Sequence, residues 1–160
     1  MSFPENFISV FARNCEVRRI DAGIAKNFME ANHRYGWSKC RHCYGLFVER
    51  EGHEGKFKVG DLVAAGCFSN ARRWKKGERD ISSYEWVRYA SLFGTRVSGG
   101  MGKILRAFIE EEKPDDIMSY APLQNGDEGE VYAKLGFTLE EVKEFEGGKS
   151  AKYRLKLTDY

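Results

Sequence analysis

Residues 96–103 read RVSGGMGK, the densest cluster of glycine in the chain, with a cation at each end. Three glycines in four residues allow a backbone to approach another group closely. An apolar stretch follows, so a helix beginning there would direct its free N–H groups and the positive end of its dipole at an anion. The chemistry that this stretch predicts is the binding of a phosphate.

Two familiar phosphate loops do not fit the stretch. In a Walker A loop, residues 102–103 would supply the final Gly-Lys, but Val97 stands where the first glycine is required and Ile104 replaces the hydroxyl that holds magnesium. In a dinucleotide-binding loop built on residues 100–102, a small residue would be required where the chain has Leu105. Both alternatives fail on chemistry.

The stretch R-V-S-G-G-M resembles the [QR]-x-x-G-x-[GA] loop of the GNAT superfamily of acetyl-coenzyme A-dependent N-acyltransferases. Arg96 and Gly99 occupy the matching positions, whereas Met101 departs from the pattern and Gly102 follows it directly. In that family the loop joins the fourth strand to a helix, and its N–H groups wrap the pyrophosphate of coenzyme A. The resemblance implies that acetyl-coenzyme A is bound by Arg96, Val97, Ser98, Gly99, Gly100, Met101, Gly102 and Lys103.

Two further stretches extend the resemblance over residues 83–137. The segment V-Y-A-K-L-G-F (131–137) resembles the family's L-Y-x-K-x-G-F, which implies Tyr132 as general acid to the leaving thiolate and Asn125, seven residues before it, as a cofactor contact. Glu85 precedes Arg96 by eleven residues, as the catalytic glutamate does in the histone-acetyltransferase-like branch. The resemblance also implies that the pantetheine arm pairs with a strand edge at Tyr89, Ala90 and Ser91. A likeness to a phage-associated branch that includes Mom-type adenine-modification enzymes rests on VSGGMGKIL and EVYAKLGF.

These residue types suit acyl transfer from a thioester to an amine. An amine of pKa about 10.4 must first lose a proton, which costs about 4.6 kcal/mol at pH 7. A buried glutamate can accept that proton, and we assign this role to Glu85. The thiolate, of pKa about 8.5, needs less help, which Tyr132 can give. The structural alternatives are a solvated or ion-paired carboxylate at Glu85 and a core tyrosine at Tyr132.

Other candidate sites are less complete. Cys40 and Cys43 have the spacing of zinc ligands, but a structural site needs four ligands, usually two such pairs. We therefore expect no metal; a redox pair is the other alternative, and Cys15 and Cys67 fit buried apolar positions. The aromatic run of His33, Tyr35 and Trp37 fits either an acceptor pocket or a packed helix end. A basic loop, expected over 70–80, either binds an anionic partner such as nucleic acid or is merely solvated; its candidate residues are Arg72, Arg73, Trp74, Lys75 and Lys76.

The bulk composition fits one globular domain over residues 1–160. Apolar residues make up 42% and charged residues 31%, and a net charge of +2 does not by itself indicate nucleic acid. The first 16 residues lack a basic segment followed by an apolar one, and no apolar run reaches the roughly 18 residues of a membrane span. We expect a cytoplasmic protein with no membrane association.

Hydrophobic periodicity predicts the elements that must position these residues. Strands are expected at 16–20, 43–50, 61–69, 83–93, 116–121, 138–145 and 151–157, and helices after Asp21, after the glycines and at 130–137. A strand–helix–strand unit in the middle makes part of the sheet parallel. The predicted fold is α/β (α+β): a mixed, mostly antiparallel, splayed sheet of about six to seven strands with helices on both faces.

The predicted function is transfer of an acyl group, taken as acetyl, from coenzyme A to an amine. The expected acceptor is a small molecule or a macromolecule that carries the amine. A binding module without catalysis, for coenzyme A or nucleic acid, and a Mom-like nucleobase-modifying enzyme are the alternatives.

Overall fold

The computed structural model describes residues 8–50, 55–122 and 130–160. The chain divides into two compact units, here called unit 1 (Met1–Ser69 and Val87–Lys113) and unit 2 (Asn70–Trp86 and Pro114–Tyr160). Strand β6 (Arg79–Ser91) contributes its first part to unit 2 and its second part to unit 1. Each unit is described by itself.

Three antiparallel strands form the centre of unit 1: β2 (Cys15–Arg19), β3 (His42–Val48) and β4 (Leu62–Phe68). The second part of β6 lies next to β4. A separate two-stranded parallel ladder joins β1 (Ile8–Phe11) to β7 (Thr95–Ser98), and a 3-10 turn, η1 (Ala12–Asn14), links β1 to β2. The sequence predicted neither β1 nor β7.

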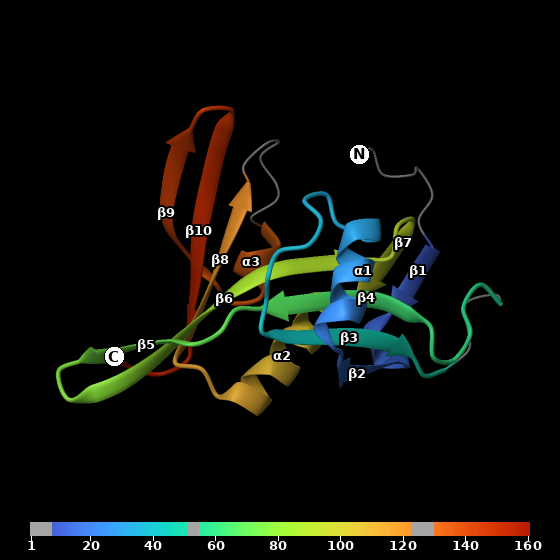
Figure 1. Ribbon diagram of the computed structural model, residues 1–160, viewed down its shortest axis with the longest axis horizontal. Helices are drawn as coiled ribbons and strands as arrows, with labels where there is room; N and C mark the ends of the chain where they lie inside the picture. The colour runs from blue at the N-terminus through green and yellow to red at the C-terminus, as the bar shows by residue number, and fades with distance from the viewer. Residues whose placement is uncertain (1–7, 51–54, 123–129) are drawn as a thin grey trace. The chain divides into compact units, whose positions relative to one another are not determined.

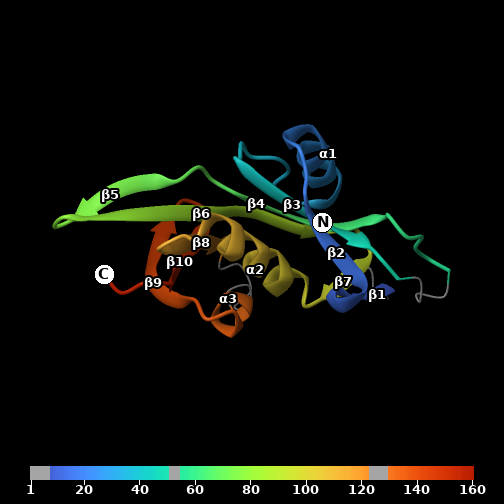
Figure 2. The same cartoon turned by 90° about the horizontal axis from the view of Figure 1, so that it is seen from below.

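Two helices cover opposite sides of β3 and β4, as Figure 2 shows. On one side, α1 (Ala22–Asn32) packs Phe28 and Met29 against Cys43 and Cys67. On the other, α2 (Gly100–Glu112) stacks Phe108 on Phe68 at 3.9 Å between ring centroids. Successive residues of a strand point to opposite faces, so one apolar strand serves both helices. The prediction of helices on both faces is confirmed in unit 1, as is the helix expected after Asp21, which caps α1 by accepting a hydrogen bond from the N–H of Ile24 at 2.8 Å.

Unit 2 contains the remaining strands (Figure 1). The first part of β6 pairs in parallel with β8 (Asp116–Pro122), with Ser83 opposite Asp116. Because α2 links β6 to β8 along the chain, the predicted strand–helix–strand unit is confirmed. The hairpin of β9 (Thr138–Phe145) and β10 (Gly148–Lys156) is antiparallel, with β10 against β8. The short helix α3 (Glu130–Lys134) ends before Gly136, whose φ of +96° explains the glycine there.

The prediction of a basic loop at 70–80 is wrong. Residues Arg72–Lys76 form strand β5, which pairs antiparallel with β6 through a two-residue connection, Gly77-Glu78. Gly77 has a φ of +65°, which a hairpin connection of this length requires at its first position. The seven expected strands are all present, and β1, β5 and β7 bring the described strands to ten.

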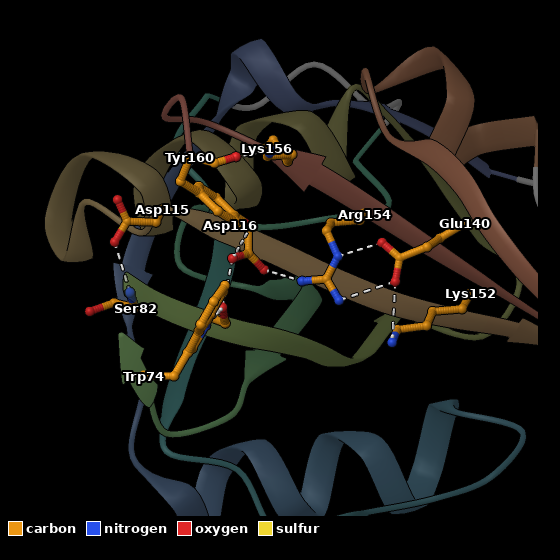
Figure 3. Close-up of polar contacts among 10 residues, drawn as sticks. Trp74, Ser82, Asp115, Asp116, Glu140, Lys152, Arg154, Lys156 and Tyr160 are labelled. Carbon is orange, nitrogen blue, oxygen red and sulfur yellow. Dashed lines mark hydrogen bonds and ion pairs between the residues drawn. The ribbon is translucent and has the colours of Figure 1, made fainter. Parts of the chain in front are cut away.

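A polar cluster around Asp116 joins five segments of unit 2 (Figure 3). The Asp116 carboxylate is fully buried and accepts hydrogen bonds from the hydroxyls of Ser83 at 2.6 Å and Tyr160 at 2.5 Å. It also pairs with Arg154, whose Nε donates to Glu140 at 2.6 Å. Burial and the bond to Asp116 raise the pKa of Tyr160 to about 12. A buried carboxylate is tolerated because every one of these contacts compensates its lost hydration.

Candidate active site

The glycine turn leads directly into α2. Gly99 is the N-cap residue, with a left-handed φ of +79°, and the helix begins at Gly100. Within the described residues no side chain caps this end, and the first helical hydrogen bond runs from the Lys103 N–H to the Gly99 carbonyl at 3.1 Å. The N–H groups of the first turn therefore have no partner within the helix, which is the arrangement that binds anions.

The two consecutive glycines, Gly99 and Gly100, are favoured for different structural reasons. Gly100 is buried, and a Cβ there would clash with the hydroxyl of Tyr89 and lie 3.0 Å from Cγ1 of Val97. The fold itself therefore requires glycine at this position. At Gly99 the nearest atom to an added Cβ is that of Ala12, at 3.6 Å, so only the backbone conformation favours glycine.

The two cations that flank the turn differ in their surroundings. Arg96 is exposed on β7 and, among the described residues, forms no ion pair. The ammonium of Lys103 instead donates to the carbonyls of Ala12, at 3.0 Å, and Cys15. Lys103 thereby holds η1 against α2, so Arg96 is the flanking cation whose charge is available to a ligand.

A cavity of about 670 Å³ adjoins the turn on the flank of α2. Sequence reasoning missed it, although its helical residues recur at the spacing of one helix face. Its polar lining contains two further cations, Arg13 and Arg106. The lining residues are Phe11, Ala12, Arg13, Val17, Ser98, Gly99, Lys103, Arg106, Ala107 and Glu110.

The predicted pantetheine edge lies in the second part of β6. Ala90 is buried in the core beneath α1, whereas Tyr89 lies under Gly100 on the α2 side. Burial raises the pKa of the Tyr89 hydroxyl. The Ser91 hydroxyl donates to the carbonyl of Thr95 at 3.1 Å. These side chains have structural partners, so what the segment can offer a ligand is its backbone.

The two predicted catalytic residues belong to unit 2. Glu85 is half-buried in the first part of β6 and lies opposite Met118 in the ladder to β8. Tyr132 lies on α3, and its hydroxyl oxygen is 2.9 Å from the hydroxyl oxygen of Ser119. Its ring stacks on Tyr153 at 5.4 Å and makes edge contacts with Trp86 and Phe137, so it has both core packing and a positioned hydroxyl. Asn125 lies outside the described residues.

The end of α1 also carries a perturbed histidine. His33 accepts a hydrogen bond at Nδ1 from the Tyr35 N–H, at 2.9 Å. Burial, with a smaller contribution from Arg88, lowers the pKa of His33 to about 4. The Arg88 Nε donates to the carbonyl of Gly36 at 3.2 Å and ties the segment to β6. These contacts favour a packed helix end.

The remaining candidates have structural contacts. Trp74 donates from Nε1 to the Ser83 hydroxyl at 2.9 Å and packs edge-on against Tyr160, so its ring is engaged in packing. The neighbouring cations of β5 are exposed, and nucleic-acid binding by them stays a prediction. In the described part of the chain no three metal-binding side chains gather at one point, and no helix there is long and apolar enough to cross a membrane.

Comparisons with known proteins come from structure alone, since the sequence matches no family model and no curated protein. NAA60 of Arabidopsis thaliana, solved with acetyl-CoA, superposes with a TM-score of 0.67 at 7% identity, over 89% of this chain and 99% of that one. Arabidopsis Naa50, solved with a CoA-peptide bisubstrate analogue, superposes with a TM-score of 0.63 at 12% identity, over 90% of this chain and 99% of that one. The ribosomal-protein-S18-alanine N-acetyltransferase of Escherichia coli has a TM-score of 0.60 at 11% identity, over 91% of this chain and 96% of that one. The chain has the fold of the GNAT acetyltransferases. In this GNAT fold, β7 leads into the glycines of the turn and α2 follows them, with β6 the next strand back along the chain.

Proposed function

We propose that the protein transfers an acetyl group from acetyl-coenzyme A to an amine. The observation that carries the proposal is the uncapped N-terminus of α2, opened by Gly99 in a left-handed conformation and preceded by Arg96. A pyrophosphate fits such a terminus because backbone N–H groups and the helix dipole both favour negative charge. Solved structures with this fold include complexes with acetyl-CoA and with a CoA analogue, which supports the same donor here.

In the proposed mechanism the donor is held mainly by backbone. The N–H groups from Val97 to Lys103 bind the pyrophosphate oxygens, and the guanidinium of Arg96 adds a charged donor. The backbone of residues 89–91 pairs with the amides of the pantetheine arm as an added strand would. Asn125 completes the set by its family position. When bound, acetyl-coenzyme A supplies an activated thioester carbonyl.

The chemical step uses two side chains. Glu85 accepts a proton from the attacking amine, whose nitrogen forms a bond to the acetyl carbon. The C–S bond then breaks, the sulfur takes its electron pair, and Tyr132 donates the proton that converts the thiolate to a thiol. General-base catalysis of this kind contributes about 10² to 10⁴ in rate. The acceptor class is an amine that carries at least one N–H proton, since that is the group that this chemistry consumes.

Donor binding gives the first test. At 100 times its dissociation constant a ligand stabilises a protein by about 2.7 kcal/mol, which for a chain of this size raises the melting temperature by roughly 5–10 °C. We expect acetyl-coenzyme A to do so for the wild type and for Gly99→Gln, and not for Gly99→Glu. The two variants share the strain of a side chain at positive φ and differ in charge at the pyrophosphate site. A shift of equal size in both variants would contradict the assignment of the turn.

A further inference from the structure

Ser119 occupies a position in β8 that the proposed mechanism does not use. Its side chain is 1% exposed, and its hydroxyl lies 3.0 Å from the carbonyl oxygen of Trp86 and 2.9 Å from the hydroxyl oxygen of Tyr132. Trp86 directly follows Glu85 in β6. The three groups form a buried chain that runs from the backbone of β6, through β8, to α3.

Ser119 has a single hydroxyl proton and can donate it to only one of its two neighbours at a time. A serine hydroxyl has one proton and two lone pairs, while a carbonyl can only accept. Ser119 therefore donates either to Trp86 or to Tyr132, and both acceptors are within hydrogen-bond distance. When it donates to Trp86, its oxygen can still accept a hydrogen bond from the Tyr132 hydroxyl.

We propose that Ser119 is a positioning residue for Tyr132, which orients the phenol before proton transfer and stabilises its oxygen afterwards. The inference rests on the proposed function. As the C–S bond breaks, the Tyr132 O–H bond breaks and an S–H bond forms, leaving negative charge on the phenol oxygen. The Ser119 hydroxyl then turns from the Trp86 carbonyl to that oxygen. A hydrogen bond to an ionised acceptor is roughly twice as strong as a neutral one, so this rotation favours proton transfer.

The packing of Tyr132 supports this role. Its ring is fixed by stacking on Tyr153 and by edge contacts with Trp86 and Phe137, so its hydroxyl oxygen has little freedom to move. The phenol has one proton, so the proton that Ser119 accepts in the resting state turns toward the sulfur as the Ser119 proton turns toward the phenol oxygen. Ser119 supports this exchange from a strand rather than a loop.

The test compares kcat, KM and the pH profile of Ser119→Ala with those of the wild type. Loss of one hydrogen bond to a charged group predicts a fall in kcat of about tenfold, with an unchanged KM for acetyl-coenzyme A. Ser119→Thr keeps the hydroxyl and is expected to recover most of the rate. The alkaline limb of the kcat profile is expected to move to higher pH in Ser119→Ala, because the ionised phenol has lost a donor.

Two controls separate this role from a loss of packing. Ser83→Ala also removes a buried hydroxyl of unit 2, but this hydroxyl donates to Asp116. The alkaline limb of the kcat profile of Ser83→Ala is therefore expected to stay at the wild-type pH. In a Tyr132→Phe background, Ser119→Ala is expected to have no further effect on kcat. Additive losses, or a Ser119→Ala enzyme with wild-type kcat and pH profile, would overturn the inference. A wild type that turns over no amine would instead overturn the proposed function.

Discussion

At the scale of single residues, Gly99 and Gly100 show how the fold and a ligand can require the same residue type for different reasons. Gly100 is fixed by the close approach of Tyr89, whereas Gly99 is fixed by its backbone conformation, since an added Cβ would lie in ordinary contact with Ala12. The sequence could show that glycines gather before a helix. It could not show that one of them packs against a tyrosine eleven residues earlier, because that contact depends on the path of β7.

Gly100→Ala is expected to destabilise the protein by about 1–3 kcal/mol, the usual effect of forcing a methyl group into a filled site. The Tyr89 hydroxyl is the clashing group, so Tyr89→Phe in the same chain is expected to recover most of the loss. Urea unfolding of the single and double variants measures both effects. A Gly100→Ala variant as stable as the wild type would show that the helix start has moved.

His33 predicts a dependence of stability on mildly acidic pH. Its pKa is lowered to about 4 in the folded protein, from 6.5 when unperturbed. Between these values the unfolded chain binds a proton that the folded chain does not, so the free energy of unfolding falls as pH falls from 6.5 towards 4. A protonated ring also loses the acceptor that the Tyr35 N–H uses.

The comparison variant is His33→Asn, which keeps an acceptor near the Nδ1 position and does not titrate. We expect its stability to vary less with pH across this window, as measured by urea unfolding at a series of pH values. Wild-type and variant curves that stay parallel from pH 6.5 to 4 would contradict the assignment.

At the scale of elements, the sequence predicted the three α-helices and seven of the described strands, and missed three short strands, β1, β5 and β7. The seven expected strands carry apolar or alternating patterns over five residues or more. β1 and β7 are four residues each and pair across more than 80 residues of chain, so no local pattern reveals them. β5 was mistaken for a loop because its side chains are mainly charged, although Gly77 at the first turn position was a usable hairpin signal.

The Asp116 cluster sets the register of β6 against β8, since Ser83 lies opposite Asp116 and Glu85 opposite Met118. Asp116→Ala leaves Arg154, Ser83 and Tyr160 without their shared acceptor, and removing one partner of a buried ion pair costs about 3–5 kcal/mol. Urea unfolding measures the loss. Glu144→Ala removes an exposed carboxylate paired with Lys149 and is expected to change stability by less than about 0.5 kcal/mol. Equal losses in the two variants would show that the cluster contributes no more than a surface pair.

At the scale of the whole molecule, the sequence motifs and the fold lead to one account. The motif at residues 96–101 predicted a helix with a phosphate-binding terminus, and the structure has a GNAT fold with an uncapped helix at that point. The roles of Glu85 and Tyr132 came from family positions rather than from periodicity. Their surroundings, a ladder partner for one and a buried hydroxyl for the other, could not be predicted because they depend on how β8 and α3 meet β6 within unit 2.

The most direct test is whether the protein acetylates an alkyl amine, measured by mass spectrometry of the acceptor with wild type and Glu85→Gln. The account predicts an acceptor heavier by one acetyl group for the wild type, and a rate lower by about 10² to 10⁴ for Glu85→Gln at pH 7. Raising the pH is expected to restore much of that loss, because more of the amine is then neutral without a base. Tyr132→Phe is expected to lose less, about 10 to 100-fold, since the thiolate can leave unaided. Binding of acetyl-coenzyme A without acetylation of any amine would contradict the account and indicate a binding module.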